Sequence, residues 1–315
     1  MLINTCINNQ QDTVPAVCFT ANEANSTIKL NITGSLTTPT LEISKDGNSW
    51  TWFTVWNIIT LNNIWDKIYM RTTSTSTTRF GTWNFTYHTF SMTWSISASW
   101  NITYLVNKNW TTSVPAYCFY NLFSWCSSLK AAPELPATSL GQHCYRELFA
   151  NTWIIKAPKL PATTIVGYCY LKMFVNCDLI EAPELPAMNV PNSAYEWMFS
   201  WCTNLVIPPK LPATTCDTQP YKDMFKNCSN LEILPLIRLS TIPNYGCNNM
   251  FSWCSKIKLS QTQVDEYQTP YEFPLGLNWG ESWNQPYGSM FSKTWWTFKW
   301  TPTLNTTYYT SNPII

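Results

Sequence analysis

The strongest constraint on the fold is a repeat of 25 or 26 residues in the middle of the chain. Six phenylalanines mark it and are expected to form the core of the repeat: Phe123, Phe149, Phe174, Phe199, Phe225 and Phe251. Prolines precede the last five at a constant interval: Pro133, Pro158, Pro183, Pro209 and Pro235. Only the stretch from each phenylalanine to the next proline varies in length. This pattern predicts a solenoid, whose coils must stack because a single unit cannot bury its apolar face alone.

Each coil is expected to hold a short strand and a short helix. The Pro-x-Leu-Pro segment must be extended, because proline fixes φ and disfavours the helical region for the residue before it. Thr138 or Ser139 can then cap a helix. Leu140, Cys144 and Leu148 follow at i, i+4 and i+8, which places one apolar stripe on that helix.

Three segments are expected. Residues 1–110 contain short runs in which apolar and polar residues alternate, and Asp46-Gly47 is a hairpin signal, so they predict an all-β sandwich-like module. Residues 111–256 form the solenoid of about six coils. Residues 257–315 hold a degenerate repeat that caps it, because Pro286–Phe291 resembles Pro220–Phe225. The expected fold class is therefore α+β.

Composition excludes several functional classes. The net charge is +1 and 12% of the residues are charged, so no surface for nucleic acid is expected. The sequence has no apolar run of about 18 residues, so no membrane-spanning helix is expected. Met1–Cys6 lacks the cationic start and apolar core of a signal peptide. We expect a protein that stays inside the cell, leaves by another route, or is released on an assembled particle.

The cysteines follow the repeat rather than a pairing scheme. Five stand three residues after the motif phenylalanine: Cys126, Cys177, Cys202, Cys228 and Cys254. Thr152 takes this position in another coil, so a bridging partner would be missing there. CxxC spacing, which zinc sites use, is absent. We expect free thiols packed as small hydrophobic groups, with no cofactor and no metal.

The residue after the motif proline alternates in charge along four coils, reading Glu134, Lys159, Glu184 and Lys210. Opposite charges on strands about 4.8 Å apart are mildly stabilising. Chance also yields such an alternation fairly often, so the support for stacking is modest. These four residues are the candidate binding face.

Another repeat position carries only tryptophan or asparagine: Trp125, Asn151, Asn176, Trp201, Asn227 and Trp253. It ends the expected helix, where a left-handed residue is common, usually Gly and sometimes Asn. Tryptophan does not fit there, because a left-handed conformation costs a non-glycine residue roughly 1–2 kcal/mol. As an alternative, the three tryptophans would form a stacking platform for sugars, but asparagine interrupts the series.

Tryptophan also outnumbers glycine, 18 to 9, although glycine is normally about 7% of residues. Further tryptophans have the polar neighbours typical of turns: Trp56, Trp65, Trp94, Trp100, Trp110, Trp279, Trp295 and Trp296. We hypothesise that most are UGA codons, read here as tryptophan but decoded as glycine in the source organism. Trp50 is expected to be genuine, and Trp283 is a second candidate exception.

The repeat resembles the BspA-like leucine-rich repeats of bacterial and phage surface proteins. Cys169–Cys177 and Ala182–Ala187 carry the pattern most fully, and Cys18–Ala21, Asp46–Trp50 and Asp66–Tyr69 resemble the β module that precedes such repeats. The resemblance implies a leucine-rich-repeat solenoid used for attachment or recognition, and it brings no catalytic residues. Thr152 and two coils that are one residue short depart from the pattern.

An enzyme is not expected. Glu134 and Glu184 could act as an acid/base pair, but they occupy equivalent surface positions of a repeat, whereas glycosidase carboxylates need a cleft. Gly-rich phosphate loops, HExxH and GxSxG are absent.

The leading hypothesis is a non-enzymatic adhesion protein that binds a glycan or a protein on a host or cell surface. Cellular relatives usually carry an export signal or wall anchor, so a phage virion or tail location is favoured over the cell surface. The alternatives are a structural spacer without a ligand and an intracellular interaction scaffold.

Overall fold

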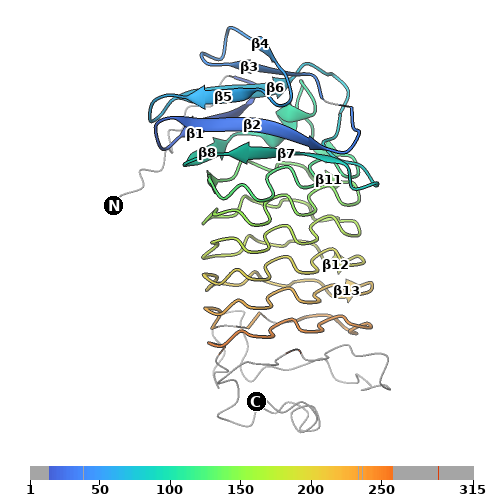
Figure 1. The fold of residues 1–315 in the computed structure, drawn as a ribbon. Helices are drawn as coiled ribbons and strands as arrows, with labels where there is room; N and C mark the ends of the chain where they lie inside the picture. The colour runs from blue at the N-terminus through green and yellow to red at the C-terminus, as the bar shows by residue number, and fades with distance from the viewer. Residues whose placement is uncertain (1–13, 38, 233, 236, 258–289, 291–315) are drawn as a thin grey trace.

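The computed structural model describes residues 14–37, 39–232, 234–235, 237–257 and 290. A β module lies across one end of a stack of coils (Figure 1). Its elements are β1 (Val17–Ala21), β2 (Ser26–Thr33), β3 (Leu41–Ser44), β4 (Thr51–Phe53), β5 (Ile58–Leu61), β6 (Lys67–Thr72), β7 (Tyr87–Met92), β8 (Ile96–Ser99) and the 3-10 helix η1 (Ile102–Leu105). The coils contribute β9 (Ser113–Val114), β10 (Leu129–Ala131), β11 (Ser139–Leu140), β12 (Asn189–Val190) and β13 (Thr215–Cys216).

The β module consists of two sheets, ordered β10-β8-β1-β6-β3-β4 and β5-β2-β7. Alternate side chains of β2 are buried, as the sequence pattern predicts for a strand with one face in a core, whereas all residues of β1 except Thr20 are buried. Phe19 of β1 packs on Phe90 of β7, with ring centroids 5.4 Å apart, so the two sheets bury their apolar faces against each other.

The same core continues into the coils without a break. Phe90 stacks on Phe123, the first motif phenylalanine, at 5.2 Å. The Phe90 N–H donates to the Leu122 carbonyl, and β10 extends the larger sheet by pairing parallel to β8. The β module therefore caps the end of the stack that would otherwise expose its core.

The motif phenylalanines form the centre of the stack. All six are fully buried, and neighbouring rings lie nearly parallel with centroids 5.5–5.8 Å apart. A second buried ladder runs beside them through Phe119, Tyr145, Tyr170, Tyr195 and Tyr221. Parallel bridges join Lys156 to Glu181 and Glu181 to Ile207, so each step along the stack advances by one repeat.

The expected helix in each coil is wrong, and the described chain is all-β rather than α+β. Its only helical segment is η1, in the β module. In the second coil the N–H groups of residues 144, 146, 148, 150 and 152 donate to the carbonyl three residues earlier. Those of residues 145, 147, 149 and 151 donate to residues 169, 171, 173 and 175 of the next coil. An α-helix would need every N–H to bond four residues back within its own segment.

The period of the apolar stripe has a different cause from the one expected. In the turn segment of each coil three residues spaced four apart are left-handed, for example His143, Glu147 and Asn151, with φ of 58°, 55° and 60°. Consecutive turns therefore repeat after four residues, and Cys144 and Leu148 are buried because they occupy the same place in successive turns. The i, i+4 spacing resembles a helical stripe, but a left-handed residue in every turn excludes a helix.

The ten described cysteines of the coils are free thiols, as expected from the repeat. The motif thiols donate to the carbonyl of a phenylalanine in the preceding coil, for example Cys202 Sγ to Phe174 O and Cys228 Sγ to Phe199 O, at 3.0 and 3.1 Å. Thr152 Oγ1 donates to the Phe149 carbonyl at 2.8 Å. This hydroxyl bonds within its own coil and not to the preceding one, so the position accepts a small buried donor without fixing its acceptor.

The expected terminal repeat in residues 257–315 lies outside the described residues, apart from its first residue and Met290. Met290 is fully buried, and its carbonyl accepts the Phe251 N–H at 2.9 Å. One coil earlier the Met250 carbonyl accepts the Phe225 N–H at the same distance. Met290 thus takes the place that a further coil would give to its methionine.

Candidate functional site

The predicted binding face forms one exposed column. Glu134, Lys159, Glu184 and Lys210 are all exposed. The bridge between Leu211 and Ile237 shows that the register is kept past the motif proline, so residues one repeat apart lie above one another. Glu134 and Glu184 consequently stand two coils apart in the same column.

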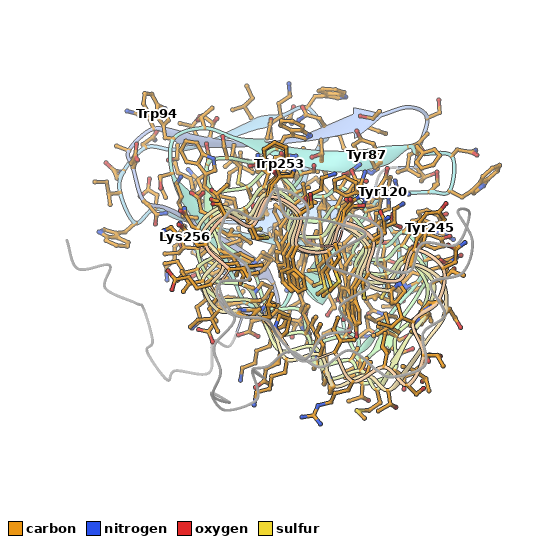
Figure 2. All side chains as sticks on the ribbon, turned by 90° about the horizontal axis from the view of Figure 1, so that it is seen from below. Tyr87, Trp94, Tyr120, Tyr245, Trp253 and Lys256 are labelled. Carbon is orange, nitrogen blue, oxygen red and sulfur yellow. The ribbon has the colours of Figure 1, made fainter. Side chains whose placement is uncertain are left out.

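A second surface lies where the β module meets the first coils, and aromatic side chains dominate it. We call it the junction patch; its members are Phe85, Tyr87, Tyr117, Tyr120, His143, Arg146 and Tyr168. The Tyr120 ring is only 4% exposed and lies at the base of the patch: Tyr87 packs edge-on against it at 5.3 Å and Tyr117 at 6.2 Å. Figure 2 places Tyr87 and Tyr120 on the same side of the stack, opposite Trp94 and Lys256.

The patch continues down the stack as a surface ladder. The His143 ring lies between Tyr117 and Tyr168, stacked on them at 4.8 and 4.7 Å. These three residues occupy the first left-handed position of successive coils, with φ of 58–61°. Their half-buried rings therefore form a column, because the coils repeat the same turn in register.

Beyond the aromatic rings the same column becomes polar. Asn192 Nδ2 donates to Tyr168 Oη at 2.8 Å, and Thr218 Oγ1 donates to Asn192 Oδ1 at 2.7 Å. Ser193 Oγ donates to Gln219 Oε1 at 3.3 Å. The surface thus offers aromatic faces near the β module and amide and hydroxyl groups farther along.

Arg146 adds a cation to the patch. Its guanidinium carbon lies 5.5 Å from the Phe85 ring centroid and 5.4 Å from that of Tyr120, and its Nε bonds the Glu147 carboxylate at 3.1 Å. These contacts hold the guanidinium against two aromatic faces. Phe85 itself is 59% exposed, so one ring of the patch is open to a partner.

Burial keeps the titratable rings of the patch uncharged. Desolvation, assisted by Arg146, lowers the pKa of His143 to about 4, and desolvation, assisted by Glu147, raises the pKa of Tyr120 to about 12. At neutral pH His143 is therefore a neutral imidazole and Tyr120 a neutral phenol. The Nδ1 atom of His143 is buried and has no hydrogen-bond partner among the described residues.

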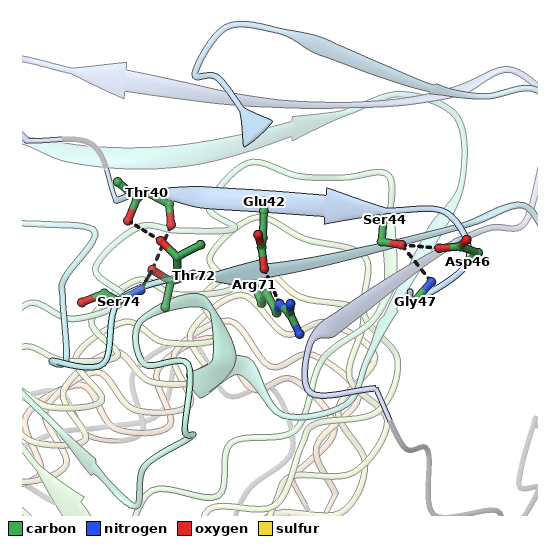
Figure 3. Close-up of polar contacts among 9 residues, drawn as sticks. Thr40, Glu42, Ser44, Asp46, Gly47, Arg71, Thr72 and Ser74 are labelled. Atoms are coloured by element: carbon green, nitrogen blue, oxygen red, sulfur yellow. Dashed lines mark hydrogen bonds and ion pairs between the residues drawn. The ribbon is translucent and has the colours of Figure 1, made fainter. Parts of the chain in front are cut away.

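The β module carries its own polar cluster on β3 and β6 (Figure 3). Arg71 Nε bonds Glu42 Oε1 at 2.6 Å across the two strands, and the guanidinium lies 3.7 Å from the Trp50 ring centroid. Asp46 accepts from the Asn48 and Ser49 N–H groups, which holds its pKa well below the ordinary range. These contacts hold the loop between β3 and β4, and Gly47 supplies its left-handed residue, with φ of 77°.

Sequence reasoning missed the junction patch. Tyr117, His143 and Tyr168 share one repeat position, six residues before the motif phenylalanine, and aligning this position would have shown three consecutive rings. Phe85 and Tyr87 lie outside the repeat, so only the fold brings them to Tyr120.

Among the described residues, no three His, Cys, Asp or Glu side chains gather closely enough to hold a metal ion. Within the same part of the chain, no helix has the length and apolar character needed to span a membrane. No protein-family model, curated protein or solved structure matches the chain significantly.

Proposed function

We propose that this protein is a non-enzymatic recognition protein that attaches to a glycan on a host or cell surface through the junction patch. The observation that carries the proposal is the set of stacked, partly exposed rings with an arginine on a rigid stack of coils. Aromatic rings and arginine are the side chains enriched at binding hot spots. Rings also offer apolar faces for the C–H faces of sugars, and their neighbouring hydroxyl and amide groups can bond sugar hydroxyls.

Rigidity supports this proposal. Tyr117, His143 and Tyr168 are held by backbone bonds between coils, for example from the Tyr117 N–H to the Gln142 carbonyl at 3.0 Å. A partner would therefore meet rings that are already ordered, which reduces the entropy lost on binding.

The proposed setting is a phage virion or tail, with a cell surface as the second possibility. The support is the resemblance of the repeat and the front module to BspA-like surface proteins. A protein on the host surface is the other ligand class that this patch would suit.

Point variants test the patch better than deletions, since the β module and coils share one core. Binding of the full chain to a glycan array and to host cells would be measured for Phe85→Ala and Tyr168→Ala. Ile58→Ala on β5 is the matched control, because Ile58 is an apolar residue with 64% exposure outside the patch. We expect each patch variant to weaken binding at least tenfold and the control to leave it unchanged.

Other outcomes point elsewhere. Binding that survives both patch variants but fails in Lys159→Glu would move recognition to the charged column. Binding to host cells that protease treatment of those cells abolishes would indicate a protein ligand. Absence of binding to arrays and cells would favour the spacer or scaffold.

A further inference from the structure

Eight of the tryptophans singled out by a turn-like context or by their repeat position lie among the described residues, and all eight are left-handed. Their φ values run from 49° to 76°: Trp56, Trp65, Trp94, Trp100, Trp110, Trp125, Trp201 and Trp253. Non-glycine residues with positive φ are uncommon, and bulky ones are genuine outliers. Glycine has no Cβ and adopts this region without steric cost.

The β module gives the clearest case. Between residues 14 and 110 seven non-glycine residues have positive φ: Asn25, Trp56, Trp65, Phe85, Trp94, Trp100 and Trp110. Five of these seven are tryptophan, and none is the aspartate that usually accompanies asparagine at such positions. The only glycines with positive φ there are Gly34 and Gly47. Tryptophan thus holds most of the positions that glycine ordinarily fills.

Packing offsets little of this backbone strain at seven of the eight positions; Trp100 is the exception, because its ring stacks on Tyr69 at 5.3 Å. Seven of the eight side chains are about half exposed or more, from 49% for Trp253 to 78% for Trp125. A large aromatic residue ordinarily buries most of its surface. Replacing these seven by glycine would therefore remove little buried apolar area.

The turns of the coils require left-handed residues whatever the residue type, so positive φ alone does not mark a tryptophan there as unusual. Each coil has three such positions, and the first two accept varied side chains, such as His143, Glu147 and Lys172. The third holds only tryptophan or asparagine, in the column that contains Trp125. Trp197 occupies the second position and is therefore left out of the set, because its φ does not distinguish it from its neighbours.

We propose that these eight positions are glycine in the natural protein, encoded by UGA codons that the source organism decodes as glycine. The proposal is independent of the proposed function, since the junction patch contains no tryptophan. The proposal rules out the alternative that Trp125, Trp201 and Trp253 form a sugar-binding platform, because glycine at these positions has no side chain.

Trp50 is the internal control. It is not among the residues with positive φ, and its ring lies under the Arg71 guanidinium, whose Nε bonds Glu42. Trp56 and Trp100 also have ring contacts, with Lys29 and Tyr69, so the ordinary backbone is what distinguishes Trp50 and makes a true tryptophan expected there. The natural gene should therefore carry UGG at Trp50 and UGA at the other eight positions.

Peptide mass mapping of the protein from its natural source tests this directly. We expect the masses of glycine at the eight positions and of tryptophan at Trp50. Tryptophan masses at most of the eight positions would overturn the proposal.

Stability gives a second, independent readout. A chain with all eight tryptophans replaced by glycine should unfold at a temperature higher by about 5 °C or more than the printed sequence. Trp50→Gly alone should lower it. An eightfold variant that unfolds at a lower temperature would contradict the inference that the fold is built for glycine.

Discussion

The β module and the coils pair their backbones in different ways. In the β module, N–H groups bond across antiparallel strands, as in the β1–β6 and β2–β7 pairs. In the coils, alternate N–H groups bond within a turn and to the next coil. Left-handed residues are consequently confined to turns in the module, whereas the coils need one in every four residues through their turn segments.

This difference determines which residue types each region tolerates at its left-handed positions. A left-handed non-glycine residue costs roughly 1–2 kcal/mol, and in the coils stacking offsets that cost, because each such turn also places apolar side chains in the core. Glu147 and Lys172 are thus tolerated at such positions. In the module no comparable stacking accompanies the left-handed turns, so residue type there reports directly on conformation.

Alkaline pH should produce the largest contrast, because ten of the eleven described cysteines lie in the coils. Burial raises the pKa of Cys169 and Cys177 to about 12, against an ordinary value of 9.0. The unfolded chain loses these protons first, so their contribution is intact below about pH 9 and is lost as pH rises toward 12. Each thiol then lowers stability by up to about 1.4 kcal/mol per pH unit.

Denaturant unfolding at pH 8 and pH 10 would measure this effect. We expect a loss of about 1 kcal/mol for each buried thiol, which over the nine buried thiols of the coils approaches the whole free energy of unfolding of a typical domain. The same experiment with Cys177→Thr should show a smaller loss, because that variant has one thiol fewer. Equal stability at the two pH values would show that the thiols are accessible in the folded state.

Removing one ring should break the coil stack at its centre. Phe174 is fully buried between Phe149 and Phe199, at 5.8 and 5.7 Å. Phe174→Ala is expected to cost about 3–5 kcal/mol of unfolding free energy, since the ladder cannot close around the cavity. Phe85→Ala in the module is the control, with an expected change within about 0.5 kcal/mol because the ring is exposed.

A thiol donor should have a smaller but specific effect. Cys202→Ala leaves the Phe174 carbonyl without its 3.0 Å donor and should cost about 1–3 kcal/mol. Cys202→Thr should cost less, because a threonine hydroxyl at this repeat position keeps a buried donor paired, as Thr152 does with the Phe149 carbonyl of its own coil. Chemical denaturation compares the two variants, and a threonine variant as unstable as the alanine variant would show that the position selects volume rather than a donor.

Much of the architecture was predictable from the repeat. Identical spacing places Phe149, Phe174 and Phe199 in identical environments, so their burial and stacking follow from sequence alone. The free motif cysteines were predictable for the same reason, because Thr152 breaks any pairing scheme.

The sequence of a single coil could not show that the expected helix is absent. Leu140, Cys144 and Leu148 have a spacing that an α-helix and a chain of four-residue turns share. The deciding quantity is the direction of the N–H groups at residues such as Tyr145, which bond to the next coil. Such partners lie one repeat away and leave no local trace in the residues that donate.

The sequence by itself therefore determined the period, the stacked aromatic core, the thiol positions and the turn positions at which tryptophan does not fit. Only the tertiary structure decided that the coils are made of turns, that the β module caps the stack, and that Phe85, Tyr120 and His143 form one surface. The physical reason is that repeated environments repeat their residues, whereas hydrogen bonds and ring contacts between distant segments depend on how the whole chain is arranged.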